Sequence, residues 1–212
     1  LLAEADPVVA ELIRSFLMWD APRAGVKAAE DKLEQLFVDA NEMRIALPEE
    51  LAGCLGSRYP ACDERCARIR SALHEVFIRE NGLALAHLRD QPKRAARAYL
   101  DSIPGMTQFV AARVALVCCE AHAFPVDRVL LGLLHDAGAA DDAESADDVA
   151  SRLERAVRAG DATGCYARLE LAAMDPPKRK KTPATKRPQS KKPAGKKSGA
   201  KKSAAKRAGK TR

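Results

Sequence analysis

The stretch that decides the fold is AARAYLDSIPGMTQFVAARVALV, at residues 95–117. Apolar residues recur at helical spacing on both sides of Ile103-Pro104-Gly105-Met106-Thr107, where proline and glycine interrupt the pattern. The sequence therefore predicts two helices joined by a tight turn, in a hairpin at about residues 95–120. The second helix would begin with free backbone N–H groups, which form a ready phosphate site, and Gly105 would let a backbone approach closely.

Helical patterns continue outward from this hairpin in both directions. Asp6-Pro7 is a cap followed by proline at the first helical position, and residues 63–80 form an amphipathic pattern with Arg65 and Arg68 on its outer face. No stretch shows convincing strand alternation. We predict an all-α fold of two lobes. The expected helices are 7–17, 26–38, a short one from residue 48, 63–80, 92–102, 108–121, 126–136, 145–159 and 163–173.

Charge divides the chain after Asp175. Residues 176–212 contain 12 Lys and 4 Arg without an acidic residue, a charge of +16, whereas residues 1–175 have 20 basic and 29 acidic residues, or −9. Residues 176–212, the basic tail, lack Val, Ile, Leu, Met and aromatic side chains, so we expect disorder and attraction to polyanions, above all DNA. Its lysines expected to meet phosphate are Lys191, Lys192, Lys196, Lys197, Lys201 and Lys202.

Six cysteines and four histidines show no close C-x-x-C pair and no metal-ligand spacing. We therefore expect reduced thiols, no metal and no cofactor. No apolar run approaches the roughly 20 residues that cross a bilayer, and no basic segment followed by an apolar stretch opens the sequence. We expect a monomeric cytoplasmic protein, associated with DNA as in a nucleoid and not with a membrane.

Two motifs carry a family resemblance. Ile103–Thr107 and the later Val126-Asp127 resemble the Leu-Pro-Gly-x-Gly hairpin and the Val-Asp pair of helix-hairpin-helix DNA glycosylases related to endonuclease III, in which the aspartate is catalytic. The resemblance extends from about Pro7 to Ala173. It implies extrusion of a damaged or mismatched base from double-stranded DNA into a pocket between two helical lobes, and cleavage of its glycosidic bond. Asp127 would activate water or stabilise positive charge on the sugar.

Three departures from the family pattern narrow this interpretation. Phe109 stands where bifunctional members carry the Schiff-base lysine, which favours a glycosylase without AP-lyase activity. Thr107 replaces the second hairpin glycine, which restricts the backbone, and the four-cysteine iron–sulfur loop is absent. In addition, Trp19 stands where relatives carry a polar residue that enters the DNA stack, so it could wedge into DNA or simply pack on the core.

Alternatives remain open for the central residues. Asp127 could simply cap a helix. Phe109, Thr107 and the negative net charge of residues 1–175, the acidic body of the chain, also fit a DNA-binding protein that has lost the catalytic activity. A third hypothesis has the tail bind RNA or ribosomes while the body docks a protein partner. Among the body's arginines we favour Arg94, Arg97, Arg113 and Arg128 for phosphate contact. The full set expected to contact DNA comprises Trp19, Ile103, Pro104, Gly105, Met106, Thr107, Gln108, Arg113 and the six tail lysines.

Overall fold

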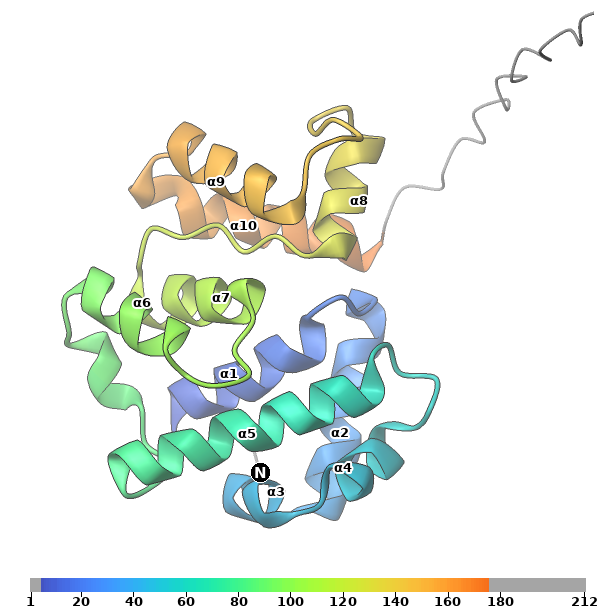
Figure 1. Ribbon diagram of the computed structural model, residues 1–212. Helices are drawn as coiled ribbons and strands as arrows, with labels where there is room; N and C mark the ends of the chain where they lie inside the picture. Colours follow the sequence, from blue (N-terminus) through green and yellow to red (C-terminus); the bar gives the residue numbers. More distant parts are fainter. Residues whose placement is uncertain (1–4, 176–212) are drawn as a thin grey trace, which may run out of the picture. The chain divides into compact units, whose positions relative to one another are not determined.

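A computed structural model describes residues 5–175, and the basic tail lies outside the described residues. This part of the chain consists of helices and connecting loops, with no strand in it (Figure 1). The all-α prediction is confirmed. Its elements are α1 (Pro7–Met18), η1 (Arg23–Gly25), α2 (Val26–Leu36), α3 (Ala40–Ile45), α4 (Pro48–Leu55), α5 (Cys62–Glu80), η2 (Ala86–Arg89), α6 (Lys93–Asp101), α7 (Gln108–Cys119), α8 (Arg128–Asp136), α9 (Ala146–Ala156) and α10 (Ala159–Met174), where η denotes a 3₁₀ turn.

Helix α1 begins where its sequence predicts. The Asp6 carboxylate accepts hydrogen bonds from the amides of Val8 (2.8 Å) and Val9 (3.2 Å), so it caps the helix. Its second oxygen accepts the amides of Leu85 (3.0 Å) and Ala86 (2.8 Å). One carboxylate therefore starts α1 and ties that start to a loop about 80 residues away in the sequence.

One helix start was not expected, and another confirms a capping signal that is weak in the sequence. Helix α3 was not predicted, because six residues are too few to show helical periodicity; Asp39 caps it by accepting the Glu42 amide (2.8 Å). Ser145 and Asp148 at α9 form a complete capping box, although aspartate at the second position is a weaker signal than glutamate. Local capping thus fixes helix starts that the apolar pattern alone leaves open.

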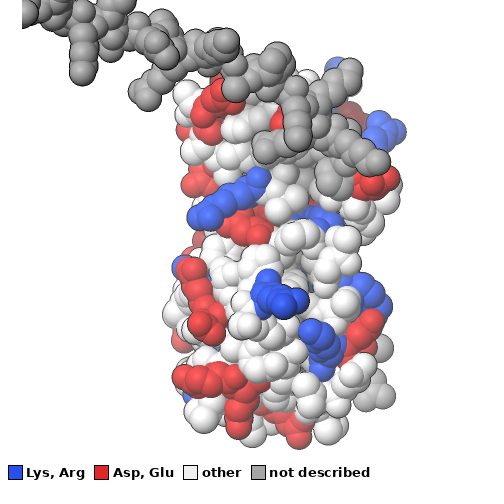
Figure 2. Space-filling model, turned by 90° about the vertical axis from the view of Figure 1, so that its right-hand side faces the viewer, with Lys and Arg blue, Asp and Glu red and all other residues white. Residues whose placement is uncertain are grey.

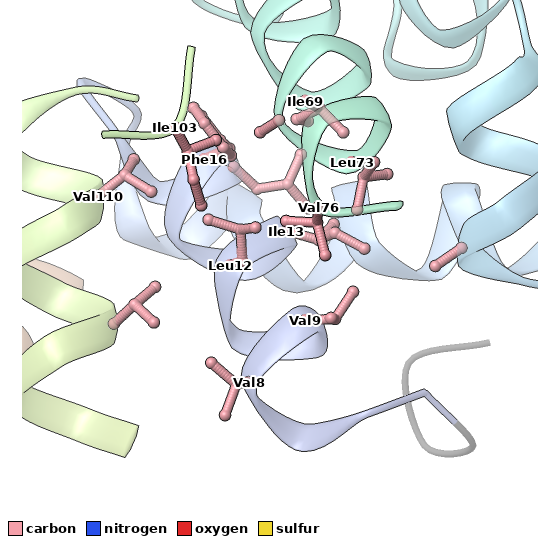
Figure 3. Packing of buried hydrophobic residues seen from close by; sticks show 14 of the residues in the cluster. Val8, Val9, Leu12, Ile13, Phe16, Ile69, Leu73, Val76, Ile103 and Val110 are labelled. Atoms are coloured by element: carbon pink, nitrogen blue, oxygen red, sulfur yellow. The ribbon is translucent and has the colours of Figure 1, made fainter. Parts of the chain in front are cut away.

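The first hydrophobic cluster is built around α1. Helix α1 lies between α5 and α7: Val9 and Ile13 lie toward Leu73 and Val76 of α5, and Leu12 lies toward Val110 of α7 (Figure 3). Ile103 of the hairpin turn is only 2% exposed and lies near Phe16, so the turn is anchored in this cluster. Burial of this side chain stabilises the hairpin by about 1.5–3 kcal/mol.

The second hydrophobic cluster gathers around α8, α9 and α10, with Phe124 of the preceding loop buried among them. Helix α7 supplies residues to both clusters: Val110 and Val114 belong to the first, and Ala112 and Leu116 belong to the second. This explains why α7 is apolar all round. The predicted two-lobed arrangement is confirmed, with α7 as the element that the two clusters share.

Arg65 corrects the predicted orientation of α5. It was expected on the outer face, yet it is fully buried and donates to the carbonyls of Phe16, Trp19 (2.5 Å) and Pro60 (2.9 Å). The last carbonyls of a helix have no intrahelical donor, and Arg65 supplies donors at the end of α1. Burial lowers the pKa of this guanidinium, and no carboxylate bonds to it among the described residues.

Candidate DNA interface and Asp127 site

The turn between α6 and α7 has the conformation that its glycine requires. Gly105 has a φ of +81°, a region that L side chains rarely adopt. A Cβ added at Gly105 would lie 3.5 Å from Arg68 Cα and 3.6 Å from Ser71 Cβ, so this backbone packs closely on α5. Arg68 Nη1 also donates to the Gly105 carbonyl (2.8 Å). The hairpin turn is therefore held by α5 as well as by Ile103.

The start of α7 keeps backbone donors available. Thr107 has an extended backbone, with a φ of −99°, and its hydroxyl accepts the Val110 amide (3.2 Å). The first intrahelical bond runs from the Ala111 amide to the Thr107 carbonyl (3.0 Å), so the amides of Gln108 and Phe109 precede it. Replacement of the family's second glycine by Thr107 thus imposes no backbone strain. It supplies an N-cap and leaves two amides for an anion.

The predicted hairpin contacts differ in exposure. Pro104 and Gln108 are exposed, and Gly105, Met106 and Thr107 are partly exposed, whereas the Ile103 side chain is buried. Contact with a phosphate would therefore involve backbone groups and the rim of the turn. Ile103 would act only by holding the turn in place.

Asp127 is the N-cap of α8. Its Oδ1 accepts the Leu130 amide (3.0 Å), and its Oδ2 accepts the Asp20 amide (2.9 Å) from the end of α1. Asp20 in turn accepts the Arg128 amide (2.8 Å), so the two aspartates cross-link the end of α1 and the start of α8. The capping prediction for Asp127 is confirmed. Its catalytic role remains a prediction.

Arg23 fills the space beside the Asp127 carboxylate. Its Nη1 lies 2.9 Å from Asp127 Oδ2 and its Nη2 lies 3.0 Å from Oδ1, a two-pronged ion pair between fully buried side chains. Arg23 Nε also donates to Glu170 of α10 (2.8 Å). Burial by itself would lower the pKa of Arg23, but hydrogen bonds and charges from Asp127 and Glu170 outweigh it and raise the pKa above its ordinary value.

Phe109 is both a core residue and a neighbour of this site. Its side chain is 3% exposed in the first hydrophobic cluster, and the Arg23 guanidinium lies 5.5 Å from its ring centroid. Phe109 also lines a cleft of about 200 Å³, together with Val126 and Arg97. A phenyl ring therefore lies where the resemblance expects a lysine in bifunctional members.

Arg113 corrects a predicted DNA contact. It is only 8% exposed, forms an ion pair with Glu11 and donates to Ser15 Oγ (2.9 Å) and the Tyr166 hydroxyl (3.1 Å). These partners come from α1 and α10, so the guanidinium lies between helices and not on the surface. The periodicity of α7 could not show this, because α7 is covered on every side.

Trp19 lies at the end of α1 in a mixed environment. It is partly buried against the first cluster, and the guanidinium carbons of Arg65 (5.6 Å) and Arg68 (5.2 Å) lie near its ring centroid. Because Arg68 also bonds to Gly105, one arginine connects Trp19 with the hairpin turn. The packing alternative for Trp19 fits this position. Its contact with DNA remains a prediction.

The surface arginines do not form a uniform basic band in the view of Figure 2. On the face drawn there, Lys and Arg side chains are interspersed with Asp, Glu and uncharged residues. Arg97 pairs with Asp101 (2.9 Å), and Arg128, whose side chain is 86% exposed, lies 3.3 Å from Asp20. Arg94 is exposed. The concentrated positive charge of the sequence lies in the basic tail, and its six predicted contact lysines are outside the described residues.

Residues 5–175 were also searched for metal-binding groups, disulfides and membrane-spanning helices. No group of three or more His, Cys, Asp or Glu side chains in this range could hold a metal ion. The six cysteines are unpaired, and burial raises the pKa of the Cys66 thiol to about 12. None of the described helices is both long and apolar enough to cross a bilayer.

Arg23 and Glu170 were missed by the sequence analysis. Arg23 follows a proline in a connecting segment, where a lone arginine is usually solvated, and Glu170 lies 147 residues away. No spacing rule joins residues at such separations. The pattern of α10 offered one weak signal, since Tyr166 and Glu170 are one helical turn apart and their side chains are hydrogen-bonded.

The chain is similar to known proteins in its fold. No protein-family model matches the sequence, and no curated protein matches it. Among solved structures, endonuclease III in a trapped covalent intermediate with DNA aligns with 78% of this chain and 73% of its own, at 17% identity and a TM-score of 0.61. A thermostable thymine-DNA glycosylase aligns with 81% of this chain and 76% of its own, at 17% identity and a TM-score of 0.57. This chain therefore has the fold of the helix-hairpin-helix DNA glycosylases.

Proposed function

We propose that this protein is a DNA-binding repair protein, and that its activity is that of a monofunctional DNA N-glycosylase acting on a flipped base. The observation that carries the proposal is the position of Asp127, which caps α8 where that helix start meets the end of α1. The hairpin that precedes it presents two backbone amides for a phosphate. The fold is one that two DNA-acting proteins share.

The chemistry proposed for Asp127 is hydrolysis of the N-glycosidic bond. The bond between the sugar C1′ and the base nitrogen breaks, and the base leaves with the bonding electrons and takes up a proton. The oxygen of water bonds to C1′ and gives up a proton, which a carboxylate at this position could accept. The same carboxylate would stabilise positive charge on the sugar before water attacks. No metal or cofactor enters this scheme.

The absence of a lysine at position 109 supports a monofunctional enzyme. A lyase of the usual kind forms an imine between a lysine amine and the opened sugar, and Phe109 cannot do so. The body contains only Lys27, Lys32 and Lys93, none of them in the hairpin. Incubation with a duplex containing an abasic site in the presence of borohydride should leave no covalent DNA adduct on residues 1–175, with peptide mass spectrometry separating these residues from the 12 lysines of the basic tail.

Double-stranded DNA is the proposed partner, bound by a monomer. Hairpin amides would contact the backbone of the duplex, while the basic tail would hold the acidic body near DNA without choosing a sequence. A DNA-associated location, as in a nucleoid, is part of this proposal. Competition between duplex DNA and structured RNA at fixed salt tests it, because preference for RNA would favour the hypothesis of an RNA-binding tail.

A second candidate function is DNA binding without catalysis. The observation that favours it is the saturation of the Asp127 carboxylate, which accepts four N–H bonds: from the amides of Asp20 and Leu130 and from both Nη atoms of Arg23. Its side chain has no exposed surface. A carboxylate held this way has no free lone pair directed at water or at a sugar.

Base release separates the two candidates. Wild type and Asp127→Asn are compared on duplexes that each contain one lesion or mismatch, with hot alkali after incubation to reveal abasic sites. Base release by wild type and its loss in Asp127→Asn, with helical content and duplex affinity retained, would support the glycosylase. No release on any duplex by a folded wild-type protein that binds DNA would leave the non-catalytic function.

A further inference from the structure

We infer that Arg23 is a latch that holds the Asp127 site closed, and that excision requires this side chain to leave the carboxylate. The inference rests on the proposed glycosylase function and concerns its regulation. It follows from what Arg23 contacts, where it lies and how short its own segment is.

The closed position of Arg23 is completely specified by hydrogen bonds. Besides the ion pair with Asp127, Arg23 donates to Glu170 and, through Nη1, to the carbonyls of Met18 (2.7 Å) and Ala21 (3.0 Å). Its side chain has no exposed surface. All three guanidinium nitrogens therefore donate hydrogen bonds, and the side chain is fixed in one position.

This position excludes the reaction. A sugar at C1′ or an attacking water must approach within hydrogen-bond reach of the catalytic carboxylate, about 2.6–3.2 Å. Arg23 occupies that distance from both oxygens of Asp127, and it also lies over the Phe109 ring. Its positive charge would moreover oppose a developing positive charge on the sugar at the same place.

The segment that carries Arg23 could release it through a small change. Arg23 opens the three-residue turn η1 between α1 and α2, directly after Pro22. Asp20 in the same connection has a φ of +52°, an unusual conformation for a residue other than glycine. DNA phosphate offers the guanidinium a competing anion, so binding of duplex at the end of α1 would favour the open form.

Two substitutions release the latch by different routes. Arg23→Met removes the guanidinium but leaves Asp127 bonded to the amides of Asp20 and Leu130. Glu170→Gln keeps Arg23 and weakens its anchor, while the amide oxygen of the new side chain can still accept the Tyr166 hydroxyl that Glu170 accepts. If Arg23→Met does not fold, because it leaves two buried carboxylates without their cation, the double variant Arg23→Met/Glu170→Gln leaves only one such carboxylate and takes its place.

The matched controls are Arg14→Met and Glu30→Gln. Arg14 and Glu30 form an ion pair of 2.5 Å between α1 and α2, and Glu30 is buried, yet neither residue contacts Asp127. Like the two test variants, they replace the arginine or the buried glutamate of an ion pair, but this pair does not include Asp127. Neither should change the rate of base release.

Single-turnover base release at saturating enzyme measures the latch. We expect about a 100-fold rise for Arg23→Met and about a tenfold rise for Glu170→Gln, as breaking a buried ion pair removes a barrier of that order. Rates equal to or below wild type in both variants, with wild type active, would overturn the latch and leave the proposed function standing. No release by any variant, although all fold and bind duplex, would overturn both.

Carbodiimide labelling of carboxyl groups gives a second readout that does not depend on activity. In wild type without DNA, Asp127 should not couple to an amine, whereas the exposed Asp147 should couple and serves as the positive control. In Arg23→Met, Asp127 should become labelled as well. Mass spectrometry of peptides locates the label. Equal labelling of Asp127 in both proteins would contradict the closure by Arg23, whatever the outcome of the base-release assay.

Discussion

The hairpin turn and the Asp127 site lie close in the sequence but depend on different things. The hairpin needs a backbone conformation, supplied by Gly105 and an N-cap, and Thr107 in place of a second glycine leaves that conformation intact. The Asp127 site needs a carboxylate in contact with a substrate, and its availability depends on Arg23 and Glu170, which are remote in the sequence. Contacts made by backbone groups tolerate substitution, whereas side-chain chemistry depends on its neighbours.

The basic tail can be weakened so that the hairpin is measured with less background. Changing Lys191, Lys192, Lys196, Lys197, Lys201 and Lys202 to Gln in the full chain should lower the slope of log affinity against log salt by up to about 5, because each phosphate contact contributes about 0.9. Duplex binding is measured between low and moderate salt. An unchanged slope would show that these lysines are not DNA contacts and that the body supplies the attraction.

The free energy of unfolding tests whether the ion pair at Asp127 holds its site together. Asp127→Asn breaks a buried ion pair and leaves Glu170 as the one carboxylate bonded to Arg23 among the described residues, so we expect the free energy of unfolding to fall by about 3 kcal/mol. Urea unfolding measures the change, with exposed Asp147→Asn as a control expected to lie within about 0.5 kcal/mol of wild type. A change as small as that of the control would mean that the ion pair does not hold the site together.

The hairpin side is tested by Gly105→Ala. A residue with a Cβ at a φ of +81° is strained, and the turn packs on α5, so we expect a loss of about 1–2 kcal/mol and weaker duplex binding. Gly53→Ala is the matched control, since Gly53 lies in α4 with nothing within 4 Å of an added Cβ and should gain about 0.5–1 kcal/mol. Equal effects of the two changes would contradict a special role for the turn.

The cap at Thr107 gives the smallest expected effect. Thr107→Ala removes the acceptor of the Val110 amide and should cost about 1 kcal/mol, whereas Thr107→Gly should cost only a few tenths. Thermal unfolding compares the two variants. A larger loss for glycine than for alanine would mean that restriction of the backbone, and not the hydroxyl, is what Thr107 contributes.

The sequence predicted features that depend on neighbours along the chain. The caps at Asp6 and Asp127 and the turn at Gly105 are local, since each involves residues within three or four positions. The arginines were predicted poorly. Arg65 and Arg113 were expected at the surface but are buried, because their partners come from helices that a linear pattern cannot bring together.

The sequence therefore predicted one residue of the candidate site but not the residues that contact it. The sequence located Asp127, but the residues that close it are 104 positions away on one side and in α10 on the other. A buried ion pair leaves no periodic signature in either segment. Its partners could be found only once the helices were placed in space.

The dual membership of α7 has a consequence for unfolding. Because its opposite faces complete both hydrophobic clusters, separating either cluster would expose apolar residues of a helix that the other still needs. The two lobes then cannot unfold independently at low cost. Amides in the middle of α7 should exchange with solvent only through global unfolding, more slowly than those of α3 or α9, and residues 5–175 should melt in one cooperative transition.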